Sequence, residues 1–70
     1  MYKKLNNLLR ENNITQREIA NKLDISSLGT VSLKLNGKSI ITFNEAMGIK
    51  ELLEERTKKK YRLEDLFWGE

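Results

Sequence analysis

The side chains that could do chemistry in this 70-residue sequence are carboxylates, amides, hydroxyls and cations, because it contains no His and no Cys. Glu51, Glu54 and Glu55 share a predicted helix surface, and carboxylates can act in acid–base catalysis. Thiol nucleophiles, thiolate metal sites and disulfides are excluded. Because there is also no cofactor motif, and the chain is too short for a deep cleft, we expect no enzyme, no metal and no cofactor.

The cations indicate a different chemistry, which is attraction to phosphate. The net charge is +3, and residues 1–38 carry seven Lys or Arg against three acids, whereas residues 39–70 carry six against seven. A basic surface supplies the salt-dependent attraction on which most DNA binding rests. An ordinary solvated surface also fits these numbers, so the charge distribution alone carries little weight.

The elements that must position these side chains are short helices. Helical spacing of apolar residues predicts one all-α domain of five helices over residues 1–70, with no strand. The expected helices run from about Lys3 to Glu11, from a cap at Thr15 to about Leu23, from a cap at Ser27 to Asn36-Gly37, from a cap at Thr42 to about Arg56, and from about Leu63 to Phe67. A core of this size is marginal, so tight packing or dimerisation would add stability.

Two of the helix starts carry a strong local signal. Thr15–Glu18 and Thr42–Glu45 both match the capping box, in which a Thr hydroxyl and a Glu carboxylate accept each other's backbone N–H groups. Apolar residues flank both caps at the spacing of a hydrophobic staple: Ile14 with Ile19, and Ile41 with Ala46. The second and fourth helices are therefore predicted to begin at these caps.

The segment from Thr15 to Gly37 is predicted to form two helices joined by a turn at Asp24–Ser27. Asp is one of the residues that tolerate the left-handed conformation such a turn needs. The small Ala20 lets the two helices cross closely. The apolar positions expected to pack them are Ala20, Leu23, Ile25, Val31 and Leu35. Within the separate helices, helical spacing groups Ile19 with Ala20 and Leu23, and Leu28 with Val31 and Leu35. This arrangement is the unit that presents its second helix to a DNA major groove.

An ordered set of segments resembles the Cro/phage-repressor helix-turn-helix family, often called the XRE family. The matching segments are Leu9–Glu11, Ile14–Ala20, Leu23–Ser26, Thr30–Ser32 and Asn36–Lys38, and the run Leu35–Ser39 with Thr42–Glu45 and Leu63–Phe67 is similar to a phage-derived branch. The resemblance implies a compact five-helix Cro/phage-repressor-like domain with its helix-turn-helix at about residues 15–37. It also implies a transcriptional regulator that binds double-stranded DNA and blocks polymerase at a promoter.

The chain departs from the family pattern within this motif. Asp24 stands where the family has a turn Gly, and the turn is one residue longer. Leu28 and Gly29 occupy positions where long polar side chains commonly read bases. These departures concern the register of the third helix and its base contacts.

The resemblance places the first phosphate contact at the start of the second helix. It assigns Gln16 to a phosphate, with the helix N-terminus adding attraction for the anion. The alternative is that Gln16 is an exposed polar residue within the capping box. Arg17, directly after it, is a second candidate for a phosphate contact.

The third helix is expected to carry the residues that read DNA. Ser27, Gly29, Thr30 and Leu33 should point away from the core, and Thr30 can bond a base edge or place its methyl against a thymine methyl. Ser27 can cap the helix and also donate to phosphate. Gly29 would allow close approach to DNA, or is simply a weak point in the helix. Leu33 either contacts thymine methyls or belongs to the core.

Further candidates flank this surface. Ser32 and Lys34 lie beside it, and Lys34 and Lys38 are candidate phosphate contacts unless they are ordinary solvated charges. Asn36 and Gly37 are expected to end the helix. The basic run Lys58–Lys60 could form a second nucleic-acid patch, although acidic residues nearby balance it.

The expected partners are double-stranded DNA and a second copy of the chain. A homodimer would read two half-sites about 34 Å apart. The pairing surface is expected in the fourth and fifth helices or the C-terminus, where Phe67 and Trp68 are core or dimer contacts.

No apolar run spans a membrane and no signal peptide is recognisable, so we expect a cytoplasmic protein with no small-molecule substrate. The alternative function is a protein-interaction module with the same fold, for example an antirepressor.

Overall fold

The computed structural model describes the backbone of residues 2–68 and the side chains of residues 2–67. Its elements are α1 (Lys3–Glu11), α2 (Gln16–Leu23), α3 (Leu28–Leu35), α4 (Phe43–Thr57) and the short π-helical turn η1 (Glu64–Trp68). No strand occurs within residues 2–68. The prediction of an all-α chain with five helical elements is therefore confirmed, and the first four match their expected bounds closely.

Both predicted capping boxes are present. At α2, the Thr15 hydroxyl accepts a hydrogen bond from the Glu18 N–H, and the Glu18 carboxylate accepts one from the Thr15 N–H, both at 3.1 Å. The corresponding distances at α4 are 3.2 Å and 3.0 Å, between Thr42 and Glu45. These bonds satisfy backbone donors that the first helical turn cannot pair internally, which explains why both helices begin there.

Left-handed residues end the helices where the sequence predicts turns. Asp24 has φ 60° after α2, and Gly37 has φ 77° after α3. Lys58, which has φ 61°, ends α4. The turn between α2 and α3 comprises residues 24–27, as predicted.

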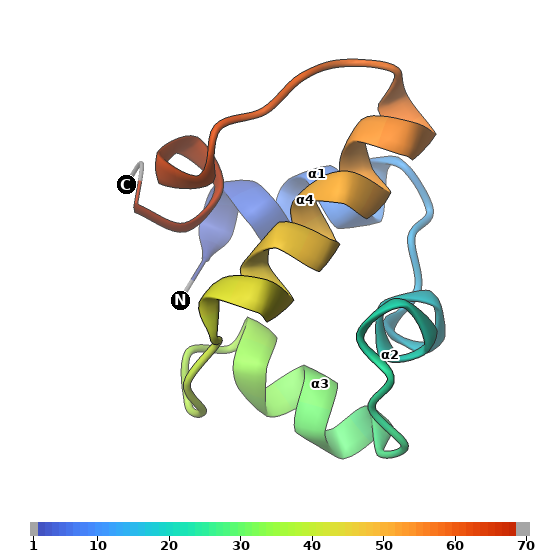
Figure 1. The fold of residues 1–70 in the computed structure, drawn as a ribbon, viewed down its shortest axis with the longest axis vertical. Coiled ribbons are helices and arrows are strands. Elements are labelled where there is room, and N and C mark those ends of the chain that lie inside the picture. Colours follow the sequence, from blue (N-terminus) through green and yellow to red (C-terminus); the bar gives the residue numbers. More distant parts are fainter. Residues whose placement is uncertain (1, 69–70) are drawn as a thin grey trace.

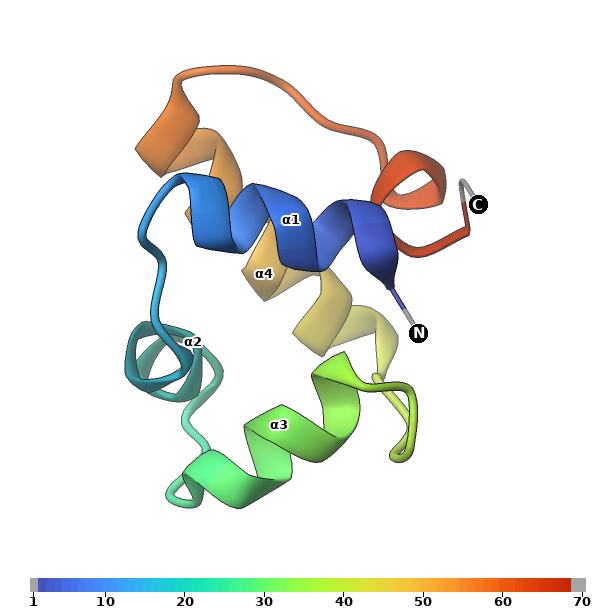
Figure 2. The same ribbon diagram turned by 180° about the vertical axis from the view of Figure 1, so that it is seen from behind.

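Helix α4 occupies the middle of the molecule and the other elements surround it (Figure 1). From behind, α1 crosses α4, with α2 and α3 at the opposite end from the loop that leaves α4 (Figure 2). α2 packs against both α3 and α4, and η1 packs against α1. The radius of gyration is 10.8 Å, close to the roughly 11 Å expected for a compact chain of this length.

A single core joins all five elements. Its buried members come from the apolar faces that the sequence predicted, together with the residue before the α2 cap: Leu5, Leu9, Ile14, Ile19, Ala20, Val31, Leu35, Ala46, Ile49, Leu53, Leu66 and Phe67. Leu23 and Ile25 are partly buried and pack against this cluster. The expected packing of α2 and α3 through these positions is confirmed.

Details at the helix ends refine the sequence prediction. Leu28, which helical spacing groups with Val31 and Leu35, is the first residue of α3 and is 39% exposed. The last helical turn is π-helical from Glu64 to Trp68, and Leu63 directly before it is helical, close to the predicted start. Phe67 is a core residue whose ring meets Tyr2 edge to face, with the ring centroids 5.3 Å apart. The prediction for Trp68 concerns a side chain outside the described residues.

Candidate nucleic-acid interface

The start of α2 presents both of its predicted phosphate contacts to the surface. Gln16 and Arg17 are the first two helical residues and are exposed. The capping box beneath them fixes the backbone from which they project. An exposed amide and guanidinium at a helix N-terminus are suited to binding an oxyanion, because the helix dipole favours negative charge there.

The glutamate of this cap is ionised and held from two sides. The pKa of Glu18 lies below its ordinary value, first because the Thr15 N–H donates to the carboxylate and also because Arg56 lies beside it. The pKa of Glu45 is lowered in the same way, by the Thr42 N–H and by Lys34. Each cap therefore carries a cation supplied by another helix.

Two residues of α1 join Gln16 at a hollow that the sequence reasoning missed. Asn6, Arg10 and Gln16 line an open space of about 310 Å³ between α1, α2 and the end of α3. Arg10 donates to the Asn7 side chain at 2.6 Å and is itself exposed. Its position in the segment Leu9–Glu11, which was part of the family resemblance, was the available signal.

The start of α3 is capped more weakly than that of α2. The Ser27 hydroxyl accepts from the Thr30 N–H at 3.4 Å, and no carboxylate completes a capping box. Ser27 and Gly29 are exposed, and Thr30 is partly exposed. A Cβ built on Gly29 would meet only the Ser27 hydroxyl, at 3.5 Å. Packing within the protein therefore does not require a glycine there.

Leu33 lies on the outer side of α3. It is 49% exposed, whereas Val31 and Leu35 are 1% and 5% exposed. The alternative that Leu33 belongs to the core is therefore wrong. Ser32 is partly buried, and its hydroxyl accepts from the Asn36 side-chain amide at 3.4 Å.

Lys34 is engaged inside the protein. Its ammonium lies 3.1 Å from the Glu45 carboxylate and donates to the Ile40 backbone carbonyl at 2.8 Å. Only 14% of its side chain is exposed. A phosphate contact from Lys34 would have to compete with both partners, which the sequence did not indicate. Lys38, by contrast, is exposed, and no hydrogen bond or ion pair of its side chain is found among the described residues.

The nine predicted site residues thus fall into three groups. Gln16 and Arg17 lie at the start of α2. Four others form the outer side of α3 and its cap: Ser27, Gly29, Thr30 and Leu33. The remaining three are Ser32 in the second half of α3, Lys34 in its last turn and Lys38 beyond it, and only Lys38 among them is exposed.

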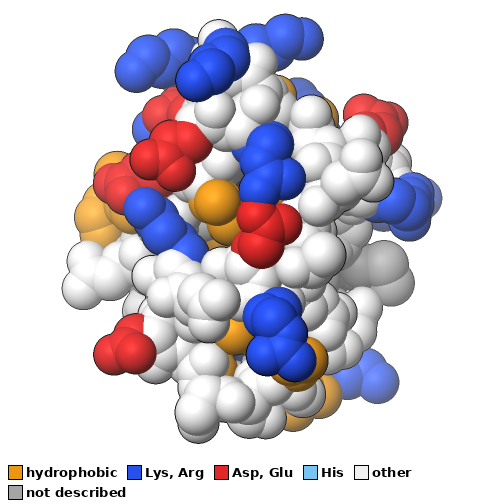
Figure 3. Space-filling view, turned by 90° about the vertical axis from the view of Figure 1, so that its right-hand side faces the viewer, with side chains coloured by type: hydrophobic (Ala, Val, Ile, Leu, Met, Phe, Trp, Pro, Cys, Tyr) orange, Lys and Arg blue, Asp and Glu red, His pale blue; other side chains and the backbone are white. Residues whose placement is uncertain are grey.

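The basic run Lys58–Lys60 lies at the opposite end of the molecule from α3. Basic side chains gather where α4 ends (Figure 3), and α4 is 15 residues long, or roughly 22 Å. Lys58 and Lys60 share an open hollow with Glu51, Glu54 and Glu55. Glu54 also accepts from the Tyr61 N–H at 2.9 Å, which fixes the loop. This run therefore does not extend the surface of α3.

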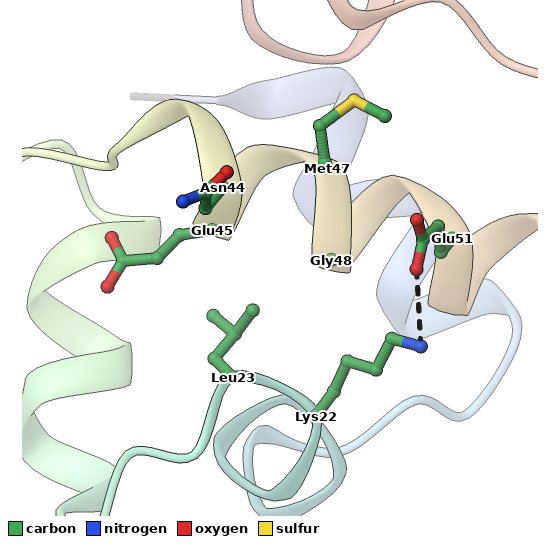
Figure 4. Close-up of a pocket in the computed structure, with 7 residues that line it drawn as sticks. All are labelled: Lys22, Leu23, Asn44, Glu45, Met47, Gly48 and Glu51. Carbon is green, nitrogen blue, oxygen red and sulfur yellow. Dashed lines mark ion pairs between the residues drawn. The ribbon is translucent and has the colours of Figure 1, made fainter.

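A wider hollow of about 490 Å³ lies between the end of α2 and α4. Leu23 points toward Gly48, and Lys22 pairs with Glu51 at 3.4 Å across the gap (Figure 4). A Cβ on Gly48 would come within 2.6 Å of a Leu23 methyl carbon. At this hollow α2 lies close to α4, and the charged groups that line it pair with protein partners.

Other kinds of site were searched for in the same residues. Among residues 2–68, no group of three or more His, Cys, Asp or Glu side chains is placed to hold a metal ion. No helix in that range combines the length and the apolar character needed to cross a membrane.

Comparison with known proteins adds no assignment. No protein-family model, curated protein or solved structure matches the chain. The likeness to the Cro/phage-repressor family therefore rests on the sequence segments described above.

Proposed function

We propose that this protein is a sequence-specific regulator that binds double-stranded DNA as a homodimer and acts by covering an operator. In this proposal, α2 and α3 are the helix-turn-helix, α3 enters the major groove and the start of α2 docks on a phosphate. Thr30 and Leu33 contact base edges, and Ser27, Gln16, Arg17 and Lys38 contact the backbone. No chemical step is required of the protein.

The observation that carries the proposal is the two-sided character of α3. Val31 and Leu35 bury one side completely, while the other side exposes small and polar groups beside a leucine. Gly29 lacks an internal packing reason, and a helix that approaches DNA closely would supply one. The four-residue turn to α2 places a capped helix start beside it.

The test is selection of bound sites from random duplex DNA, followed by two variants of the protein. We expect Thr30→Ala to weaken binding by about 1–3 kcal/mol and to relax preference at one base position. We expect Lys38→Ala to weaken all sequences alike and to lower the salt slope by about 1. If no sequence is enriched, the regulator proposal fails. If Thr30→Ala leaves affinity and preference unchanged, the reading surface is misplaced.

A protein-interaction module remains the second candidate, favoured by one observation. Ile40 and Phe43 are 82% and 69% exposed on either side of the α4 cap, which is unusual for side chains this large. The same binding experiment separates the two functions. DNA affinity that barely changes between low and high salt would favour the interaction module, because phosphate contacts give a steep dependence.

A further inference from the structure

Arg56, near the end of α4, connects three segments that are far apart in the sequence. Its Nη1 donates to the Asn12 backbone carbonyl at 3.1 Å, and its Nη2 pairs with the Glu18 carboxylate. Asn12 ends α1 and Glu18 belongs to the first turn of α2. One guanidinium therefore holds both sides of the loop that leads into α2.

The two carboxylate oxygens of Glu18 have different partners. Oε1 accepts the Thr15 N–H at 3.1 Å and so closes the capping box, while Oε2 faces Arg56. The loop between these anchors also contains Asn13, whose φ of 57° is left-handed. Because Arg56 contacts both ends of this short loop, it adds a constraint on the α2 start to those from the packing of α2 against α4.

The energetic value of this pair is too small to explain it as a stabilising contact. The side chains of Arg56 and Glu18 are 36% and 35% exposed, and ion pairs that solvent reaches contribute little net stability. Their geometric effect is larger, since an oxyanion contact depends on where the first N–H groups and side chains of the helix point.

We propose that Arg56 is a positioning residue for phosphate docking at the start of α2. The inference rests on the proposed DNA-binding function. Arg56 acts through Glu18 and Asn12 on the placement of Gln16. It does not bind phosphate itself, because both of its terminal nitrogens face protein oxygens.

Two substitutions, each of which neutralises one charge, separate the Arg56–Glu18 ion pair from the capping box. Glu18→Gln keeps a side chain that can complete a capping box but removes the ion pair, and Arg56→Gln removes it from the other side. Two control variants match them in charge. Glu55→Gln removes an exposed carboxylate of α4, and Arg62→Gln removes an exposed guanidinium that pairs with nearby Glu64.

The readout is affinity for the selected DNA site at fixed salt. We expect Glu18→Gln and Arg56→Gln each to lower affinity about tenfold relative to its control, which corresponds to loss of one charge-assisted hydrogen bond. The double variant should bind no worse than either single variant. Both effects should vanish in a Gln16→Ala background, and base preference should not change.

The outcomes that overturn the inference are distinct. If Glu18→Gln binds more tightly than Glu55→Gln, the released Arg56 contacts phosphate directly. If Arg56→Gln equals Arg62→Gln, Arg56 has no role beyond its charge.

Hydrogen exchange keeps the inference testable even if the wild-type protein binds no DNA, which would refute the proposed function by itself. Arg56→Gln should then speed exchange of the Thr15 and Glu18 amides and leave α3 unchanged. Uniformly faster exchange, or no change at Thr15 and Glu18, would show that Arg56 does not position this helix start.

Discussion

The two helices of the central motif are eight residues each, but the protein holds them differently. α2 is fixed at both ends: Arg56 pairs with Glu18 at its start, and Lys22 pairs with Glu51 near its end. α3 is fixed at its far end, where Lys34 reaches Glu45 and the Ile40 carbonyl. Its start has a single hydroxyl cap at 3.4 Å.

This difference matches the two tasks we assign to the helices. A helix that docks on the uniform phosphate backbone benefits from a fixed position. A helix that reads bases must fit a groove whose shape changes with sequence, and a lightly capped start leaves room for adjustment. The comparison suggests that α4 serves as the frame to which both helices are attached.

The largest expected effect is the difference in stability loss between a substitution on the buried side of α2 and one on the outer side of α3. Ile19 is 1% exposed and Leu33 is 49% exposed. We expect Ile19→Ala to lower the free energy of unfolding by about 2–5 kcal/mol, enough to unfold much of a domain this small. Leu33→Ala should stay within about 0.5 kcal/mol. Urea unfolding measures both, and equal losses would mean that Leu33 does not lie on the outer side of α3.

The caps provide the next test. We expect Thr15→Ala to lower the free energy of unfolding by about 1 kcal/mol, as loss of an N-cap usually does. Ser27→Ala should lower the free energy of unfolding by less, because the Ser27 hydroxyl accepts a longer hydrogen bond and no carboxylate completes a capping box. Thermal unfolding of the two variants side by side gives the comparison. A larger loss from Ser27→Ala would contradict the view that the α3 start is the less firmly held.

The smallest change in the free energy of unfolding is expected when either of two helical glycines is replaced by alanine. Gly29→Ala should raise the free energy of unfolding by about 0.5–1 kcal/mol, since alanine favours helix and the added methyl makes only an ordinary contact with the Ser27 hydroxyl, at 3.5 Å. In Gly48→Ala the same gain should be cancelled by overlap with Leu23. If Gly29→Ala stabilises the fold yet weakens DNA binding, the glycine serves the interface. Equal stabilisation by both variants would contradict the close contact of α2 with α4.

The local features were predictable from the sequence because their signals lie within a few residues. Both capping boxes, the left-handed Asp24 and the stop at Gly37 depend on neighbours in the chain, and the structure contains all of them. Helical spacing also identified most of the core. It could not show where the core ends, so Leu28 was grouped with Val31 and Leu35 but is exposed.

The contacts that connect distant segments were not predictable in the same way. Lys34 was a candidate phosphate contact, but its ammonium pairs with the Glu45 carboxylate and donates to the Ile40 carbonyl. Arg56 was not identified at all, because its partners lie 44 and 38 residues away. Local patterns define a helix and its face, whereas the choice among many possible ion pairs depends on the relative placement of helices.

The edge-to-face contact of Tyr2 with Phe67 has a consequence for the order of folding. These rings are 65 positions apart in the chain, so their contact closes almost the whole polypeptide, and closing a longer loop costs more chain entropy. The contacts of α2 with α3 and α4 close much shorter stretches. We therefore expect the segment from α2 to α4 to become ordered before α1 and η1 dock together. The transition state would then contain the proposed DNA-reading helices and lack the paired ends.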